Sequence, residues 1–150
     1  MKKLLFLLVA LLVGLTSACK KDKDPEPVKP AVAVAGTYTL SAFRFATPDG
    51  NINLPTLPTT VNGRAVSGTV VFEQVSGQDA KANMTVTLKV SGQQDIAIDP
   101  IEVAIEVTGP YTLKLDGQAA GKVEGNTATF NFSETTPQGQ RVELSFTGRK

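Results

Sequence analysis

The stretch MTVTLKV at residues 84–90 decides the fold, because apolar and polar residues alternate along it. Successive side chains of a β-strand point to opposite faces, so this pattern places one face on a core and the other in water. Residues 101–108 repeat it as IEVAIEVT, residues 111–116 as YTLKLD, and residues 142–147 as VELSFT. Beyond the first nineteen residues we find no segment of ten with helical periodicity. The pattern predicts an all-β protein.

Turn sequences separate these segments at short spacing. Ser76-Gly77, Ser91-Gly92 and Asp116-Gly117 are typical of tight connections between antiparallel strands. We expect an antiparallel meander of eight or nine strands, the number depending on whether Pro100 divides one bent strand, since proline cannot donate to a β-ladder. The expected strands cover residues 36–45, 66–75, 81–91, 94–98, 101–108, 111–116, 119–124, 126–134 and 140–148.

One apolar and one polar face per strand is typical of a closed barrel or of a two-sheet β-sandwich in water, and both remain open. The strands of an outer-membrane barrel also alternate, but such a barrel has girdles of aromatic residues at both membrane interfaces. This chain has only two tyrosines and no tryptophan to form them. The first strand changes phase: Tyr38, Leu40 and Ala42 lie on one face, and Phe43 and Phe45 on the other. This change predicts a bulge or a sheet edge.

Residues 34–41, VAGTYTLS, resemble the entry to lipocalin-like barrels, in which a Gly-x-Trp element begins the first strand and plugs the closed end. Tyr38 takes the aromatic position here. The resemblance implies a calycin-type barrel over residues 35–150 that binds a small hydrophobic molecule. It also implies a barrel-closing contact between Tyr38 and the late arginine, Arg149. The helices of the fatty-acid-binding type and the C-terminal helix of secreted lipocalins are missing.

Inward-facing residues of such a barrel would line a ligand cavity. Alternation together with the opening motif selects five candidates, which are Met84, Leu88, Ile101, Ile105 and Phe130. The alternative is a structural or protein-interaction module of the cell envelope, with a filled core and no ligand.

The first nineteen residues predict the location. Lys2 and Lys3 precede an apolar run of about 12 residues, which is shorter than the roughly 20 that span a bilayer, and small or polar residues follow before Cys19. The segment resembles a bacterial lipoprotein signal, although Thr16 stands where leucine is usual. The resemblance implies a signal peptide over residues 1–18 and lipid, including palmitate, on Cys19.

Residues 19–34 are charged and proline-rich, so we expect a disordered tether that holds the domain away from the membrane. The Lys/Asp cluster after Cys19 resembles the export signal of surface lipoproteins. We therefore expect a lipid-anchored protein of the bacterial outer membrane that faces the periplasm or the cell surface. The sequence does not predict its oligomeric state.

The composition argues against several activities. The chain has no histidine, the commonest general base, and its single cysteine is assigned to lipid, so we expect no enzyme, no cofactor and no metal. Glu102 and Glu106 share the polar face of one strand, where a solvated surface is the simpler interpretation. Asp95 and Asp99 lack the loop pattern of calcium sites. Residues 36–150 hold nine basic and eleven acidic side chains without a basic block, which disfavours nucleic acid.

The segment over residues 46–65 is rich in proline and glycine and contains apolar residues. A connection of this length is uncommon in a compact domain and is often functional. Two interpretations remain open: a lid or contact surface at a barrel mouth, and a loop packed on the domain with a short strand inside it.

Overall fold

The computed structural model describes residues 28–150, which form one short helix and eleven strands. The elements in chain order are α2 (Pro30–Val34), β1 (Gly36–Thr47), β2 (Gly50–Leu54), β3 (Thr59–Val61), β4 (Arg64–Gln74), β5 (Lys81–Val90), β6 (Ile96–Ala97), β7 (Ile101–Val107), β8 (Tyr111–Leu115), β9 (Gln118–Glu124), β10 (Thr127–Thr135) and β11 (Arg141–Arg149).

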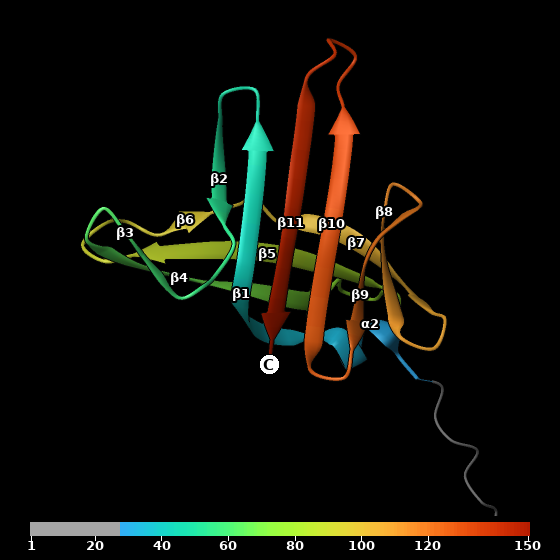
Figure 1. Cartoon of the computed structure of the whole chain (residues 1–150). Helices are drawn as coiled ribbons and strands as arrows, with labels where there is room; N and C mark the ends of the chain where they lie inside the picture. Colours follow the sequence, from blue (N-terminus) through green and yellow to red (C-terminus); the bar gives the residue numbers. More distant parts are fainter. Residues whose placement is uncertain (1–27) are drawn as a thin grey trace, which may run out of the picture.

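Eight of the strands close into an antiparallel barrel. Each pairs with its neighbour in the order β1, β11, β10, β9, β8, β7, β5 and β4, and β4 then pairs with β1 to close the ring. Figure 1 shows the upright strands β1, β11 and β10 crossing in front of β4 and β5, with α2 at their lower end. The all-β prediction and its barrel form are confirmed, and the sandwich alternative is wrong.

The predicted change of phase in β1 is a β-bulge. Leu40 pairs with Gly148 and Ala42 pairs with Thr147, so Ser41 is the extra residue. The bulge turns Phe43 toward the interior, where it is 2% exposed, while Leu40 before the bulge also points inward. One additional residue thus keeps the apolar side chains of both halves of β1 on the inner face.

The bulge also separates two different pairings of β1. Before it, Gly36–Thr39 pair with β4 and complete the barrel. After it, Phe43–Thr47 pair with β2 instead. The barrel is therefore closed at the end where β1 begins and divided at the end where β1 finishes.

Pro100 lies at the end of an interruption between two strands, β6 and β7, and this settles the number of strands that the sequence left undecided. β6 pairs with the C-terminal part of β5 and β7 with its N-terminal part, and residues 98–100 lie between them. A proline at this position fits because it has no backbone N–H to donate. The two short strands are two parts of one interrupted edge along β5.

Residues 46–65 contain two short strands, β2 and β3, which is nearer to the interpretation of a packed loop with one short strand than to a lid. The Pro48-Asp49 turn leads from β1 back into β2, and β3 forms a tight hairpin with β4 around Asn62 and Gly63, which both have positive φ. Leu54 and Leu57 are buried, and the Leu57 N–H donates to the Ser41 carbonyl at the bulge. The segment is thus built into the sheet and extends two barrel strands, and it is not a free loop.

The closed end is covered by α2, which corrects one predicted boundary. Ala31 and Val34 are fully buried, and the Ala31 N–H donates to the Asp79 carbonyl in the turn between β4 and β5. Residues 30–34 therefore belong to the domain and not to a disordered tether, since their apolar side chains find a partner on the barrel. The predicted signal peptide over residues 1–18, Cys19 and the tether over residues 19–27 lie outside the described residues.

Candidate functional site

The interior at the closed end is filled around Tyr38. This side chain is fully buried, its ring packs edge-on against Phe72 at 5.6 Å, and its hydroxyl donates to the Val34 carbonyl at 2.8 Å. Burial raises the pKa of the Tyr38 phenol above its usual value of 10.0 because it disfavours the charged form. Tyr38 thus joins the α2 helix to the barrel core.

The cation beside Tyr38 is Lys150, so the predicted contact with Arg149 is wrong. The Lys150 ammonium lies 5.0 Å from the centre of the Tyr38 ring and donates to the Ala35 carbonyl at 2.7 Å. Arg149 pairs with Thr39 in the ladder, and both are exposed. Strand alternation explains the difference, because Gly148 faces Tyr38 and its neighbour Arg149 must then point outward.

Packing in the middle of the barrel is also close. A Cβ added at Gly68 would lie 2.8 Å from side-chain carbons of Leu40 and Leu88, and one at Gly121 would collide with the Thr129 carbonyl oxygen. Gly121 therefore requires glycine because the backbone of the paired strand cannot give way, whereas at Gly68 the ends of two leucine side chains would have to shift. The interior beside Gly68 is filled by the side chains of Leu40 and Leu88.

The five predicted cavity residues divide between this packed part and the divided end. Met84 is fully buried and pairs with both Phe72 and Ile101 across the ladder. Ile105 is 4% exposed and pairs with Leu113. All five lie on apolar inner positions, and only Leu88 lines the opening described next, so the structure does not bring them together around one space.

A cleft opens at the divided end, between two walls of the barrel. We call it the mouth cleft. One wall is the inner face of β1 and β2, and the other belongs to β3, β4, β5 and β6. The apolar residues of the first wall are Phe43, Phe45, Ile52 and Leu54. Those of the second wall are Val61, Val66, Leu88, Val90, Ile96 and Ile98.

The mouth cleft consists of two adjoining hollows of about 440 and 290 Å³, which share Ile52, Leu88 and Ile96 as walls. Small-molecule sites in proteins range over roughly 300–1,000 Å³ and are mostly apolar with a few polar groups. Two side chains of this cleft remain unusually open for aliphatic residues, since Val61 is 42% and Ile96 is 46% exposed. The size and lining suit an apolar molecule.

Polar groups stand at the rim of the cleft. Asn62, Arg64 and Gln93 line the larger hollow, and Asp99 lines the smaller one. The alternation pattern did identify Leu88. Ile52, Leu54 and Val61 were missed because they lie in residues 46–65, and the other apolar cleft residues lie in predicted strands but were not selected as cavity residues. The Asn62-Gly63 pair, a typical hairpin turn, was the available signal for β3 and β4.

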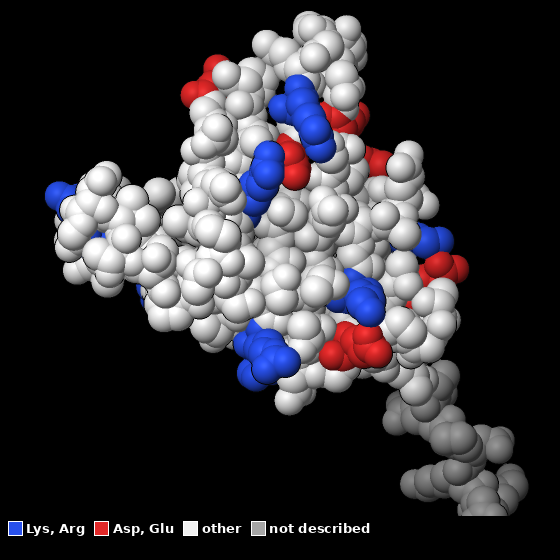
Figure 2. All heavy atoms as spheres, in the orientation of Figure 1, with Lys and Arg blue, Asp and Glu red and all other residues white. Residues whose placement is uncertain are grey.

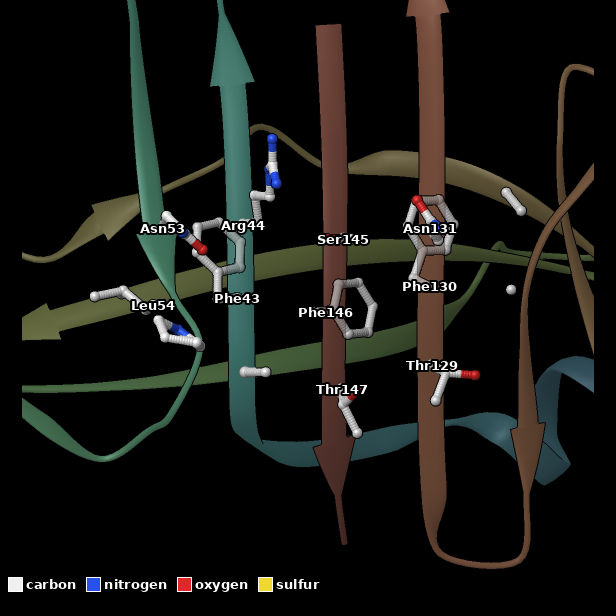
Figure 3. A pocket seen from close by; sticks show the side chains of 14 residues that line it. Phe43, Arg44, Asn53, Leu54, Thr129, Phe130, Asn131, Ser145, Phe146 and Thr147 are labelled. Atoms are coloured by element: carbon white, nitrogen blue, oxygen red, sulfur yellow. The ribbon is translucent and has the colours of Figure 1, made fainter.

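A second, shallower hollow of about 420 Å³ lies on the outer face over β1, β11 and β10. Phe43, Phe146 and Phe130 are successive ladder partners and lie side by side beneath it, as Figure 3 shows. Exposed or half-buried polar side chains flank this row on the outside. They are Arg44, Asn53, Thr129, Asn131, Ser145 and Thr147. This hollow is wide open and its outward groups are those of an ordinary solvated sheet face.

The carboxylates considered for catalysis are paired with lysines. Glu102 accepts from Lys81 at 2.6 Å, and Glu106 lies 2.6 Å from Lys114. Among residues 28–150 no three potential metal-ligating side chains gather, and no helix there has the length and apolar character needed to cross a bilayer. Figure 2 shows charged side chains dispersed over the visible face, without a gathering of lysine and arginine.

Comparison with protein-family models, with curated proteins and with solved structures finds no match. The class of protein shown is therefore that of the fold: an antiparallel β-barrel with lipocalin-like topology.

Proposed function

We propose that this chain is a lipid-anchored protein of the bacterial cell envelope that binds a small hydrophobic molecule in the mouth cleft. The observation that carries the proposal is the cleft itself, an apolar opening of suitable size at one end of an otherwise packed barrel. Burying the apolar surface of a ligand there would also cover Val61 and Ile96, whose exposure to water is unfavourable.

The location in this proposal depends on Cys19 and the signal-like segment before it, which resemble those of bacterial lipoproteins. More than one acyl chain on a cysteine gives stable membrane attachment, whereas a single chain binds only marginally. The outer membrane is the proposed site, with the barrel in the periplasm or at the cell surface.

Ligand binding is tested with the mature chain, residues 19–150, carrying Cys19→Ser so that it can be studied without detergent. N-phenyl-1-naphthylamine, a neutral fluorescent probe of apolar sites, should increase in emission and saturate at one probe per chain. The variant Leu88→Asp, which places a carboxylate in both hollows, should abolish the increase. Lys89→Asp changes the neighbouring outward residue and serves as the matched control. Equal emission from the two variants would contradict a site in the cleft.

Lipid attachment is tested separately in a bacterial host fed an alkyne-bearing palmitate. The full chain should take up the label, and Cys19→Ala should not. Ser17→Ala, two residues away, is the control that should keep it. An unlabelled full chain would overturn the anchor without affecting the binding proposal.

The alternative, an envelope interaction module without a ligand, is favoured by one observation: the interior around Tyr38 is filled. It predicts that N-phenyl-1-naphthylamine finds no saturable site.

A further inference from the structure

Arg64 is the one cationic side chain lining the mouth cleft in the part of the chain that the structure describes. It begins β4, two residues before Val66, which is 5% exposed and points inward. Residues two apart on a strand share a face, so Arg64 lies on the cleft side. Its ladder partner Val61 lies on the same side and is itself a cleft residue.

Among residues 28–150, no carboxylate forms an ion pair with Arg64. The ion pairs within residues 28–150 involve Lys29, Arg44, Lys81, Lys114, Lys122 and Arg141, and none includes Arg64. Its neighbours at the rim are the amides of Asn62 and Gln93, which are hydrogen-bonding groups without charge. A planar guanidinium can bind a carboxylate or phosphate through two parallel hydrogen bonds.

The smaller hollow of the cleft carries the opposite charge at its rim. Its walls include the aromatic side chains of Phe43 and Phe45, together with Ile98, and its rim carries the carboxylate of Asp99. A negatively charged group would be repelled there, while an apolar chain would bury surface against the rings. The two hollows are therefore both mainly apolar, and they differ in the charge at the rim, which is positive at Arg64 and negative at Asp99.

We infer that the molecule bound in the mouth cleft is a single-chain amphiphile with an anionic head, which Arg64 holds at the rim while the tail lies toward Phe43 and Phe45. This inference rests on the proposed function, because it assigns the chemical class and the direction of that ligand. Carboxylate and phosphate heads share the chemistry that Arg64 recognises.

The test measures displacement of N-phenyl-1-naphthylamine from the Cys19→Ser mature chain by four competitors of equal chain length: laurate, dodecyl phosphate, dodecanol and dodecylammonium. At low salt we expect either anion to bind about five- to tenfold more tightly than dodecanol, and dodecylammonium more weakly. Arg64→Gln should bring the affinities for anion and alcohol within about twofold while leaving dodecanol unchanged. Arg64→Glu should make dodecylammonium the preferred competitor.

Lys89→Gln is the matched control, since it removes one positive charge from the same end of the barrel on the outer face. It should preserve the preference for anions. Equal affinity of the unsubstituted chain for anion and alcohol would overturn the inference and leave the proposed function standing. Displacement by none of the four would also overturn the inference, whereas the proposed function is contradicted separately, by a probe that finds no saturable site or that binds the Leu88→Asp and Lys89→Asp variants equally. A stronger response to one anion than to the other identifies the head group.

Discussion

The two ends of the barrel share β1, and they differ in what pairs with it. At the closed end β1 pairs with β4, α2 covers the opening, and Tyr38 is fully buried. At the divided end the same strand pairs with β2, and Val61 and Ile96 remain substantially exposed. The comparison indicates that the packing that stabilises the fold is concentrated at the closed end. The apolar surface that a ligand could cover lies at the divided end.

The largest expected effect comes from removing an aromatic ring at the closed end. Phe72→Ala deletes a side chain that is 1% exposed and packs on Tyr38, so unfolding should become about 3–5 kcal/mol easier. Val61→Ala at the mouth should cost well under about 1 kcal/mol, because that residue is largely in water. Urea denaturation of both variants measures their free energies of unfolding. Similar losses of stability in the two variants would contradict the difference in packing between the two ends.

Tyr38→Phe keeps the ring and removes one buried hydrogen bond. The Val34 carbonyl loses the hydroxyl donor, so we expect a loss of about 1–2 kcal/mol in the free energy of unfolding. Unchanged stability in urea would show that α2 is not held through this bond.

The same residue gives the closed end a dependence on alkaline pH. Burial raises the pKa of Tyr38 in the folded state. The contribution of the neutral Tyr38 phenol to the stability of the fold is therefore complete below pH 10, and it is lost as the pH rises through the folded-state pKa. Tyr111→Phe leaves Tyr38 as the single tyrosine for an ultraviolet titration. Its ionisation should occur at higher pH in the folded chain than in urea, and coincident titrations would contradict the burial argument.

Lys150→Ala should have a smaller effect, roughly 0.5–1 kcal/mol, because its ammonium is partly in water while contacting the Tyr38 ring and the Ala35 carbonyl. Arg149→Ala is the control on the adjacent outward position and should be neutral within about 0.5 kcal/mol. Thermal unfolding followed by circular dichroism compares them. A larger loss of stability from Arg149→Ala than from Lys150→Ala would contradict the assignment of Lys150 as the cation that holds Tyr38.

The smallest effect on stability, and the clearest effect on binding, is expected at the mouth. Ile96→Ser removes a half-exposed apolar wall of both hollows, so unfolding should change by less than about 0.5 kcal/mol. The affinity for N-phenyl-1-naphthylamine should fall several-fold. Val107→Ser, which changes another exposed aliphatic residue away from the cleft, should leave both quantities unchanged.

The sequence was sufficient to predict the barrel because alternation is a local property of each strand. The expected strands from residue 66 onward agree with the observed ones to within a few residues, and even the bulge near Ser41 was visible as a change of phase. Pro100 was likewise recognised as an interruption.

The mouth cleft was not predictable in the same way. Its walls depend on the exchange of partners by β1, which is set by contacts between distant residues such as Leu57 and Ser41. Alternation says that Met84, Leu88 and Ile105 point inward, but it does not say where the interior is filled. The choice of Arg149 over Lys150 failed for a different reason: it came from the resemblance to lipocalins, whereas the alternation of residues 142–147 already placed Arg149 on the outer face with Thr147.

The position of α2 has a consequence for how the barrel would stand on a membrane. The chain enters the barrel through α2, which lies at the lower end of β1, β11 and β10, away from β2 and β3 (Figure 1). With Cys19 in the lipid, as we propose, the tether would join the barrel at its covered base, so that the point of attachment would not obstruct the opening. A ligand could then enter the cleft from the aqueous compartment without passing the lipid anchor.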